Sequence, residues 1–107
     1  MTTREIKSFK MISGEEVVAE VVGHRFVGAD SGGEAFILAR PHVLQVQNAG
    51  TGPLRLAFIP WTLSNPTVER LEVPCSAIIV SYFPNESVQR QYLHQIYGPA
   101  TERVSPN

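Results

Sequence analysis

The sequence predicts a small, mostly β domain that ends in a single α-helix. Five apolar segments with period-two alternation, rich in β-branched residues and separated by turn residues, run from residue 6 to residue 82. One amphipathic stretch, residues 86–97, follows them. These patterns predict a barrel-like sheet with a helix at its C-terminal end and no helix at its N-terminal end.

The first two strands are expected at residues 6–12 and 17–27. Gly14 suits the turn between them, because glycine adopts the positive φ that tight turns require. The second strand alternates one set of residues, Val17, Ala19 and Val21, with another, Val18, Glu20 and Val22. Its β-branched content predicts that it is buried in part on both faces. Residues 28–34, which are rich in glycine, predict a loop after it.

The third strand is expected at residues 35–47, with Pro41 in its middle. Because proline cannot donate a hydrogen bond to a neighbouring strand, this strand either lies at an edge there or bends at a bulge. The fourth strand, residues 54–61, is interrupted by a Ser-Asn-Pro turn and resumes as an extended segment at residues 67–73.

A short, uncharged strand and the helix complete the predicted domain. The strand is expected at residues 77–82, after a corner at Pro74. Asn85 can cap the helix by accepting from a free backbone N–H, and Glu86 suits the positive end of the helix dipole. Gly98 and the proline after it predict the end of the helix, which we place at about residues 86–97.

Length and composition fit one domain, residues 1–98, followed by residues 99–107, which we expect to be a disordered tail. The 107 residues are 43% hydrophobic, and the formal net charge is −1. This charge lacks the basic excess of a dedicated duplex-DNA binder, so any nucleic-acid site must be a local patch. Cys75 is the only cysteine, and no signal-peptide core or apolar stretch of about 18 residues is present. We expect a cytoplasmic protein with no membrane contact.

No known enzyme or metal site can be identified in the sequence. The three histidines fall in different predicted elements without the spacing of metal ligands: His24, His42 and His94. Glu15 and Glu16 lie beside a turn, where a solvated hairpin tip is a simpler interpretation than acid–base catalysis. No Gly-x-Ser-x-Gly surrounds Ser76, and the glycines of residues 28–33 lack the Lys-Ser/Thr of a phosphate-binding loop. We expect no catalytic activity, metal or cofactor.

Three residues are candidates for contact with nucleic acid: Arg40, His42 and Trp61. Arg40 and His42 interrupt an apolar strand with a cation and a hydrogen-bonding ring. Arg40 either extends into solvent at a strand bend or lines a groove with His42 and contacts a phosphate or a base. Trp61 is either a core or interface aromatic or a stacking platform for a base.

Three stretches resemble a known protein family: IKSFKMISGEEVVAEVV at residues 6–22, PWTLSNP at 60–66, and VPCSAIIVSYFPNE at 73–86. They are similar to a family of small marine cyanophage proteins of unknown cellular function with an Sm-like fold. The resemblance implies a strongly bent, five-stranded antiparallel sheet that forms a small open barrel. The wider Sm/LSm group assembles into rings and binds RNA.

Two features fit the Sm plan, and three depart from it. The turn at Gly14 resembles the first half of the Sm1 motif, and the corner at Pro74 resembles the Sm2 position. The Arg-Gly of Sm2 is replaced by Pro74-Cys75, and the Asp and Met-Asn pattern of Sm1 is absent from residues 28–34. The predicted helix is also C-terminal instead of N-terminal. The resemblance therefore implies the fold and the ring, but not the standard RNA-contacting residues.

The function expected from this resemblance is a ring-forming, Sm-like nucleic-acid-binding protein of a phage, located in the host cytoplasm. It would bind single-stranded RNA or DNA by backbone contacts from Arg or Lys and by stacking on an aromatic. The alternative is a phage assembly or adaptor scaffold that binds no nucleic acid, which the near-neutral charge favours.

The ring is also expected from the strand that begins at Ala77. Its first residues are uncharged and apolar, and an exposed apolar edge strand invites uncontrolled pairing. Pairing with residues 67–73 of the next copy would cover this edge and, repeated head to tail, would close a ring of about five to seven subunits. The predicted interface consists of Ala77, Ile78, Ile79, Val80, Leu71 and Val73.

Overall fold

The computed structural model describes residues 4–26, 33–47 and 55–98. It contains six strands, a short 3-10 helix at Cys75–Ala77 and one α-helix. The elements are β1 (Ile6–Met11), β2 (Glu16–Phe26), β3 (Glu34–Gln47), β4 (Arg55–Pro60), β5 (Arg70–Pro74), β6 (Ile78–Tyr82) and α1 (Glu86–Tyr97). Most of the loop expected at residues 28–34 and the tail expected at 99–107 lie outside the described residues.

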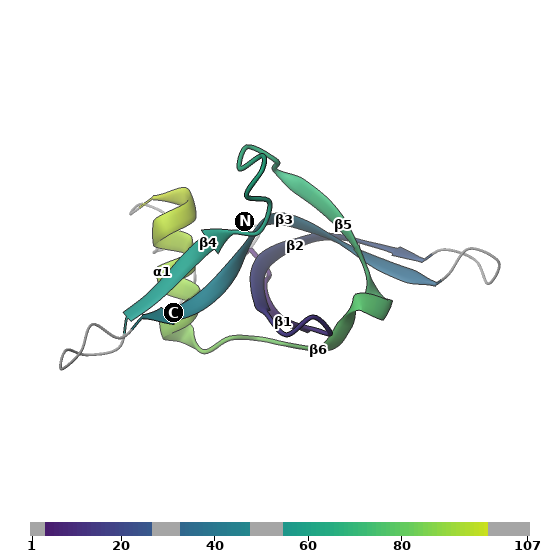
Figure 1. Cartoon of the computed structure of the whole chain (residues 1–107), viewed down its shortest axis with the longest axis horizontal. Helices are drawn as coiled ribbons and strands as arrows, with labels where there is room; N and C mark the ends of the chain where they lie inside the picture. The colour runs from purple at the N-terminus through teal and green to yellow at the C-terminus, as the bar shows by residue number, and fades with distance from the viewer. Residues whose placement is uncertain (1–3, 27–32, 48–54, 99–107) are drawn as a thin grey trace.

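The strands form one strongly curled, open antiparallel sheet, a half-barrel, which α1 follows in the sequence (Figure 1). The strand order is β4-β3-β2-β1-β6, and β5 pairs with β3 as well. Residues 35–39 of β3 pair with β5, whereas residues 42–47 pair with β4, so β4 and β5 follow one another along the same side of β3. The sheet is therefore five strands wide, which confirms the predicted fold class.

A β-bulge bends β3 at Arg40 and Pro41. Val18 pairs with His42 and Glu20 pairs with Ala39, so two residues of β3 lie opposite one residue of β2. Arg40 has a φ of 50° and is the only non-glycine residue with positive φ in the described part of the chain. Of the two alternatives for Pro41, the bulge is therefore correct, because β3 has neighbours on both sides.

The bulge is also where the neighbour of β3 changes from β4 to β5. The N–H of Trp61 donates to the carbonyl of Pro41 at 3.1 Å, and the N–H of Arg40 donates to the carbonyl of Glu69 at 2.9 Å. Residues 62–68 leave the sheet between these two hydrogen bonds. The segment expected to resume at residue 67 begins at Arg70 instead, because Asn65 holds Thr67 in a turn through its side-chain oxygen.

Two hydrophobic cores lie on opposite faces of the sheet. The inner core, enclosed by the curl, is built around Phe9, Met11, Val17, Ala19, Leu38 and Val73. The outer core lies between the sheet and α1 and is built around Ile6, Val18, Phe58, Tyr92 and Leu93. Because Val17 and Val18 belong to different cores and are both completely buried, the prediction that β2 is buried on both faces is confirmed.

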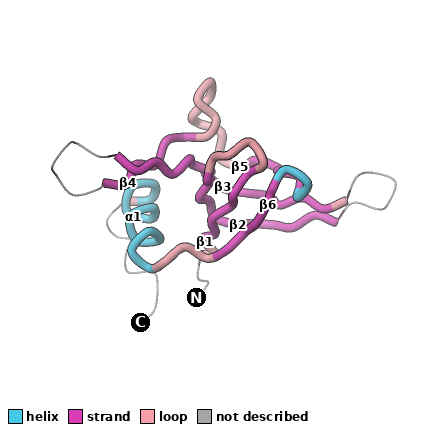
Figure 2. The backbone as a smooth tube through the Cα atoms, turned by 60° about the horizontal axis from the view of Figure 1, so that its bottom comes forward, coloured by secondary structure: helices cyan, strands magenta, loops and turns pink. Residues whose placement is uncertain are grey.

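Helix α1 has the predicted bounds and caps, and it lies across the outer face of the sheet (Figure 2). The Asn85 side chain accepts from the N–H of Val88 at 2.9 Å, and Gly98 follows the last turn with a φ of 95°. The Tyr92 hydroxyl donates to the carbonyl of Arg40 at 2.7 Å, which joins the helix to the bulge. No helix within the described residues is long and apolar enough to cross a membrane.

The Tyr92 hydroxyl should stabilise the fold measurably. Tyr92 is completely buried, so Tyr92→Phe removes a buried donor and should lower the free energy of unfolding by about 1 kcal/mol. Tyr82→Phe is the matched control, because the Tyr82 hydroxyl donates to Glu16 at a solvent-exposed site and should contribute less. Urea denaturation measures both. An equal or smaller loss for Tyr92→Phe would contradict the role given to this hydrogen bond.

Candidate functional site

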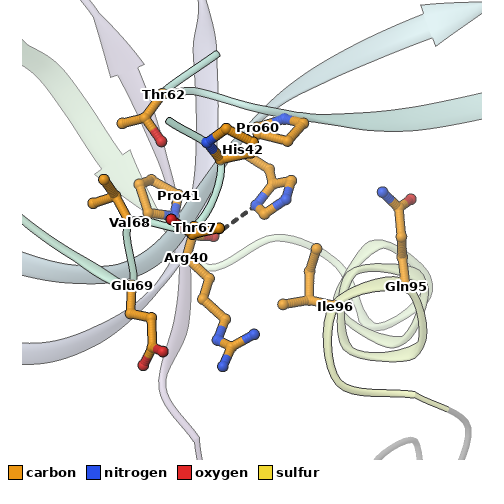
Figure 3. A pocket seen from close by; sticks show the side chains of 11 residues that line it. Arg40, Pro41, His42, Pro60, Thr62, Thr67, Val68, Glu69, Gln95 and Ile96 are labelled. Atoms are coloured by element: carbon orange, nitrogen blue, oxygen red, sulfur yellow. Dashed lines mark hydrogen bonds between the residues drawn. The ribbon is translucent and has the colours of Figure 1, made fainter. Parts of the chain in front are cut away.

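A pocket of about 460 Å³ opens beside the β3 bulge. Its walls come from the bulge, from the segment between β4 and β5, and from the last turns of α1 (Figure 3). The polar residues that line it are Arg40, His42, Thr62, Thr67, Glu69 and Gln95. Its apolar wall consists of Pro41, Pro60, Pro66, Val68 and Ile96. The structure thus brings Arg40 and His42 together in one concave site.

His42 is held in a defined orientation by the bulge. Its Nδ1 lies 2.8 Å from the carbonyl of Arg40, and a carbonyl only accepts, so Nδ1 carries the hydrogen and Nε2 is left as an acceptor. Burial lowers the pKa of His42 below 6.5, and the charge of Arg40 lowers it further, although the bond to the Arg40 carbonyl acts in the opposite direction. His42 is therefore a neutral ring at pH 7.

The segment between β4 and β5 forms a preorganised wall. The Thr62 hydroxyl donates to the carbonyl of Asn65 at 2.9 Å, and the Thr67 hydroxyl donates to the Asn65 side-chain oxygen at 2.6 Å. Both hydroxyl hydrogens are therefore engaged within the segment, and both oxygens can still accept. On the opposite wall, the Gln95 amide donates to the carbonyl of Phe58 at 2.8 Å, which leaves its oxygen and its second N–H for a ligand.

A second pocket, of about 360 Å³, adjoins the first and shares Arg40 and Glu69 with it. Its charged lining residues are Arg4, Arg40, Arg70, Glu20 and Glu69, a formal charge of +1. Tyr97 forms part of its wall, with the guanidinium of Arg4 at 4.0 Å and that of Arg40 at 5.1 Å from the ring centroid. Burial and the hydrogen bond from its hydroxyl to Glu20 raise the pKa of Tyr97 to about 12.

Trp61 is not among the residues that line either pocket. Its ring packs against the inner core, and its indole N–H donates to the Glu15 carboxylate at 3.2 Å. This contact orients Glu15 beside its turn, where the hydroxyl of Ser13 is the main cause of a lowered Glu15 pKa. The site assembled by the structure therefore contains two of the three residues singled out in the sequence.

The predicted interface residues divide into two groups. The side chains of the first group pack against the inner core of their own chain: Leu71, Val73, Ala77 and Ile78. Ile79 and Val80, in contrast, are 63% and 48% exposed. A bulge in β6 explains why two consecutive side chains face solvent, because the pairing with β1 skips Ile79. Ala77, expected in the strand, belongs to the 3-10 helix before it.

Most residues of the two pockets were missed in the sequence, among them Arg4, Glu69, Arg70 and Gln95. These four come from the N-terminal segment, the β4–β5 connection, β5 and α1, and no motif links them. Only the proline-rich interruption of the fourth strand indicated that the chain leaves the sheet at this place. No family model and no curated protein sequence matches this chain.

The stability of the protein should fall below pH 6.5 in a manner that depends on His42. The folded state lowers the pKa of His42, so the unfolded chain takes up the proton more readily. The contribution of the neutral ring is complete above pH 6.5 and is lost as the pH falls through the folded-state pKa. Urea denaturation at pH 7 and pH 5 should show a larger loss for the natural chain than for His42→Gln. An equal loss in both would contradict the buried, neutral ring.

Proposed function

We propose that this protein is a ring-forming, Sm-like protein that binds single-stranded RNA or DNA at the β3 bulge. The observation that supports this most is the position of Arg40, which lines both pockets. Its guanidinium has no ion-pair partner within the described residues, whereas Arg4 pairs with Glu20 at 2.9 Å. An arginine in this state is available for a phosphate group, for which its planar donors are well suited.

The charge of the second pocket supports contact with a nucleic-acid backbone. The whole chain has a formal net charge of −1, so only a local patch can attract phosphates. Such a patch is formed by three arginines, Arg4, Arg40 and Arg70, whose charge exceeds that of the two carboxylates in the same pocket. The first pocket lies next to this patch and is large enough for a small ligand, since such sites span about 300–1,000 Å³.

The free edges of the curled sheet support assembly into a ring. Within the described residues, β6 pairs only with β1 and β5 pairs only with β3, so one side of each strand remains open. β6 carries no charged residue, whereas β5 carries Arg70 and Glu72 and ends at Pro74. Pairing β6 of one copy with β5 of the next would extend the sheet head to tail and close a ring of about five to seven copies.

A phage assembly or adaptor scaffold is the second candidate, and the solvent-exposed apolar groups favour it. Phe83 is 64% exposed directly after β6, and Lys7 lies 4.9 Å from its ring centroid. An aromatic beside an open edge is suited to contact another protein. Both candidate functions place the protein in the host cytoplasm, and they differ only in whether the protein binds nucleic acid.

Assembly should depend on the exposed edge of β6. Light scattering behind a sizing column should give a mass of about 59–83 kDa, five to seven times the 11.8 kDa of one chain. Ile79→Lys places a charge at this edge and should release monomers. Val46→Lys is the control, since Val46 is similarly exposed, at 58%, but lies on β3. A stable monomer of the natural chain would rule out the ring.

Nucleic-acid binding should depend on Arg40 and His42 together. The double variant Arg40→Gln, His42→Ala should weaken binding of a labelled single-stranded RNA at least tenfold. The slope of log K against log salt should also become shallower by about 1. Fluorescence anisotropy at several salt concentrations measures both quantities.

Arg90→Gln is the control for this experiment, because it removes the same charge from an exposed helix position paired with Glu86. It should leave affinity and slope nearly unchanged. If the natural chain forms the ring but does not bind RNA or DNA, the scaffold is the correct function. If it binds and the double variant binds equally well, the strand lies elsewhere on the molecule.

A further inference from the structure

We infer that the pocket at the β3 bulge selects a guanine base, with the N1–H and N2–H edge of the base on the Glu69 carboxylate. This inference deepens the proposed function and rests on it, since the base is taken to belong to the bound strand. It names the ligand chemistry that the described residues of the pocket can recognise.

The hydrogen-bonding inventory of the pocket contains one cationic donor among several acceptors. The Nε2 of His42 and the side-chain oxygen of Gln95 accept, because their partner nitrogens already donate to backbone carbonyls. The threonine hydroxyls of the wall have donated their hydrogens to Asn65. Apart from Arg40 and the second N–H of the Gln95 amide, the polar side chains that line the pocket therefore offer acceptors. Such a site favours the base with the most N–H groups, which is guanine.

Glu69 is the acceptor that distinguishes guanine from the other bases. Its carboxylate has no hydrogen-bond or ion-pair partner within the described residues. Its backbone is fixed by the hydrogen bond from the N–H of Arg40 at 2.9 Å. Two parallel N–H groups on one edge match a carboxylate, and guanine alone among the four common bases has them. Uracil would present its carbonyl oxygens on either side of a single N–H.

The shape and charge of the two pockets indicate which pocket holds the base and which holds the phosphate. One cation and one anion, Arg40 and Glu69, line the first pocket, and His42 is neutral, so this pocket has no net charge. Figure 3 shows Ile96 of α1 pointing towards Arg40 and His42 across the pocket, which gives apolar contact for the face of a base. The adjoining pocket, with its formal charge of +1, is the better place for phosphate.

The test compares single-stranded oligonucleotides that differ in one base. A uridine tract with one central guanosine should bind about tenfold more tightly than the same tract with inosine, which lacks the N2 amino group, or with adenosine. Glu69→Gln should bring these ratios close to one. Glu86→Gln, which removes a carboxylate from an exposed pair on α1, should leave the ratios unchanged. Guanosine monophosphate should compete for the guanosine-containing strand.

The outcomes separate this inference from the proposed function. Equal affinity for all the tracts, with binding still weakened by the Arg40 and His42 double variant, overturns guanine selection and leaves strand binding in place. A preference for guanosine that survives Glu69→Gln also overturns it. Binding of guanosine monophosphate with no binding of any strand supports the base pocket and contradicts the proposed function. No binding of nucleotide or strand overturns both.

Discussion

The carbonyl of Arg40 joins the three parts of the molecule on which the candidate site depends. It accepts from the hydroxyl of Tyr92 on α1 and from the Nδ1–H of His42, and it belongs to a residue with left-handed backbone geometry. The bulge removes this carbonyl from the regular pairing of the sheet. The Tyr92 hydroxyl and the His42 imidazole donate the hydrogen bonds that it then needs. Without this arrangement, α1 would lose the hydrogen bond that joins Tyr92 to the bulge.

The bulge also determines how the curled sheet makes room for a ligand. Because Pro41 has no N–H, β3 cannot continue its ladder through this position, and its neighbour leaves the sheet between Trp61 and Glu69. The departing segment forms one wall of the pocket, and α1 forms the wall opposite. The inner core, by contrast, fills the curl itself, so the described pockets lie beside the bulge and towards the helix.

Most of the fold could be predicted from the sequence, because its signals are local. The alternation of β2 and the caps of α1 at Asn85 and Gly98 each depend on a few neighbouring residues. Pro41 indicated a bulge or an edge, and only the pairing of β3 on both sides decided between them. The bulge at Ile79 left no such signal, because isoleucine is common in regular strands.

The candidate site was predicted only in part, for a physical reason. Arg40 and His42 could be identified as polar residues within an apolar strand. Glu69 and Gln95, which line the same pocket, come from distant segments that tertiary structure brings together. Trp61 has the residue type of a stacking platform, yet its ring packs against the inner core. Which face an aromatic presents depends on strand register, which composition does not reveal.

The most direct test of the account is a side-chain amide spectrum of the ¹⁵N-labelled protein titrated with a single-stranded RNA. The resonances of the Arg40 Nε–H and the Gln95 amide should shift, because both side chains line the pocket at the bulge. The indole N–H of Trp61, which donates to Glu15, should remain in place. A shift of the Trp61 indole while the Arg40 and Gln95 resonances stay unchanged would contradict the claim that the bulge positions the binding site.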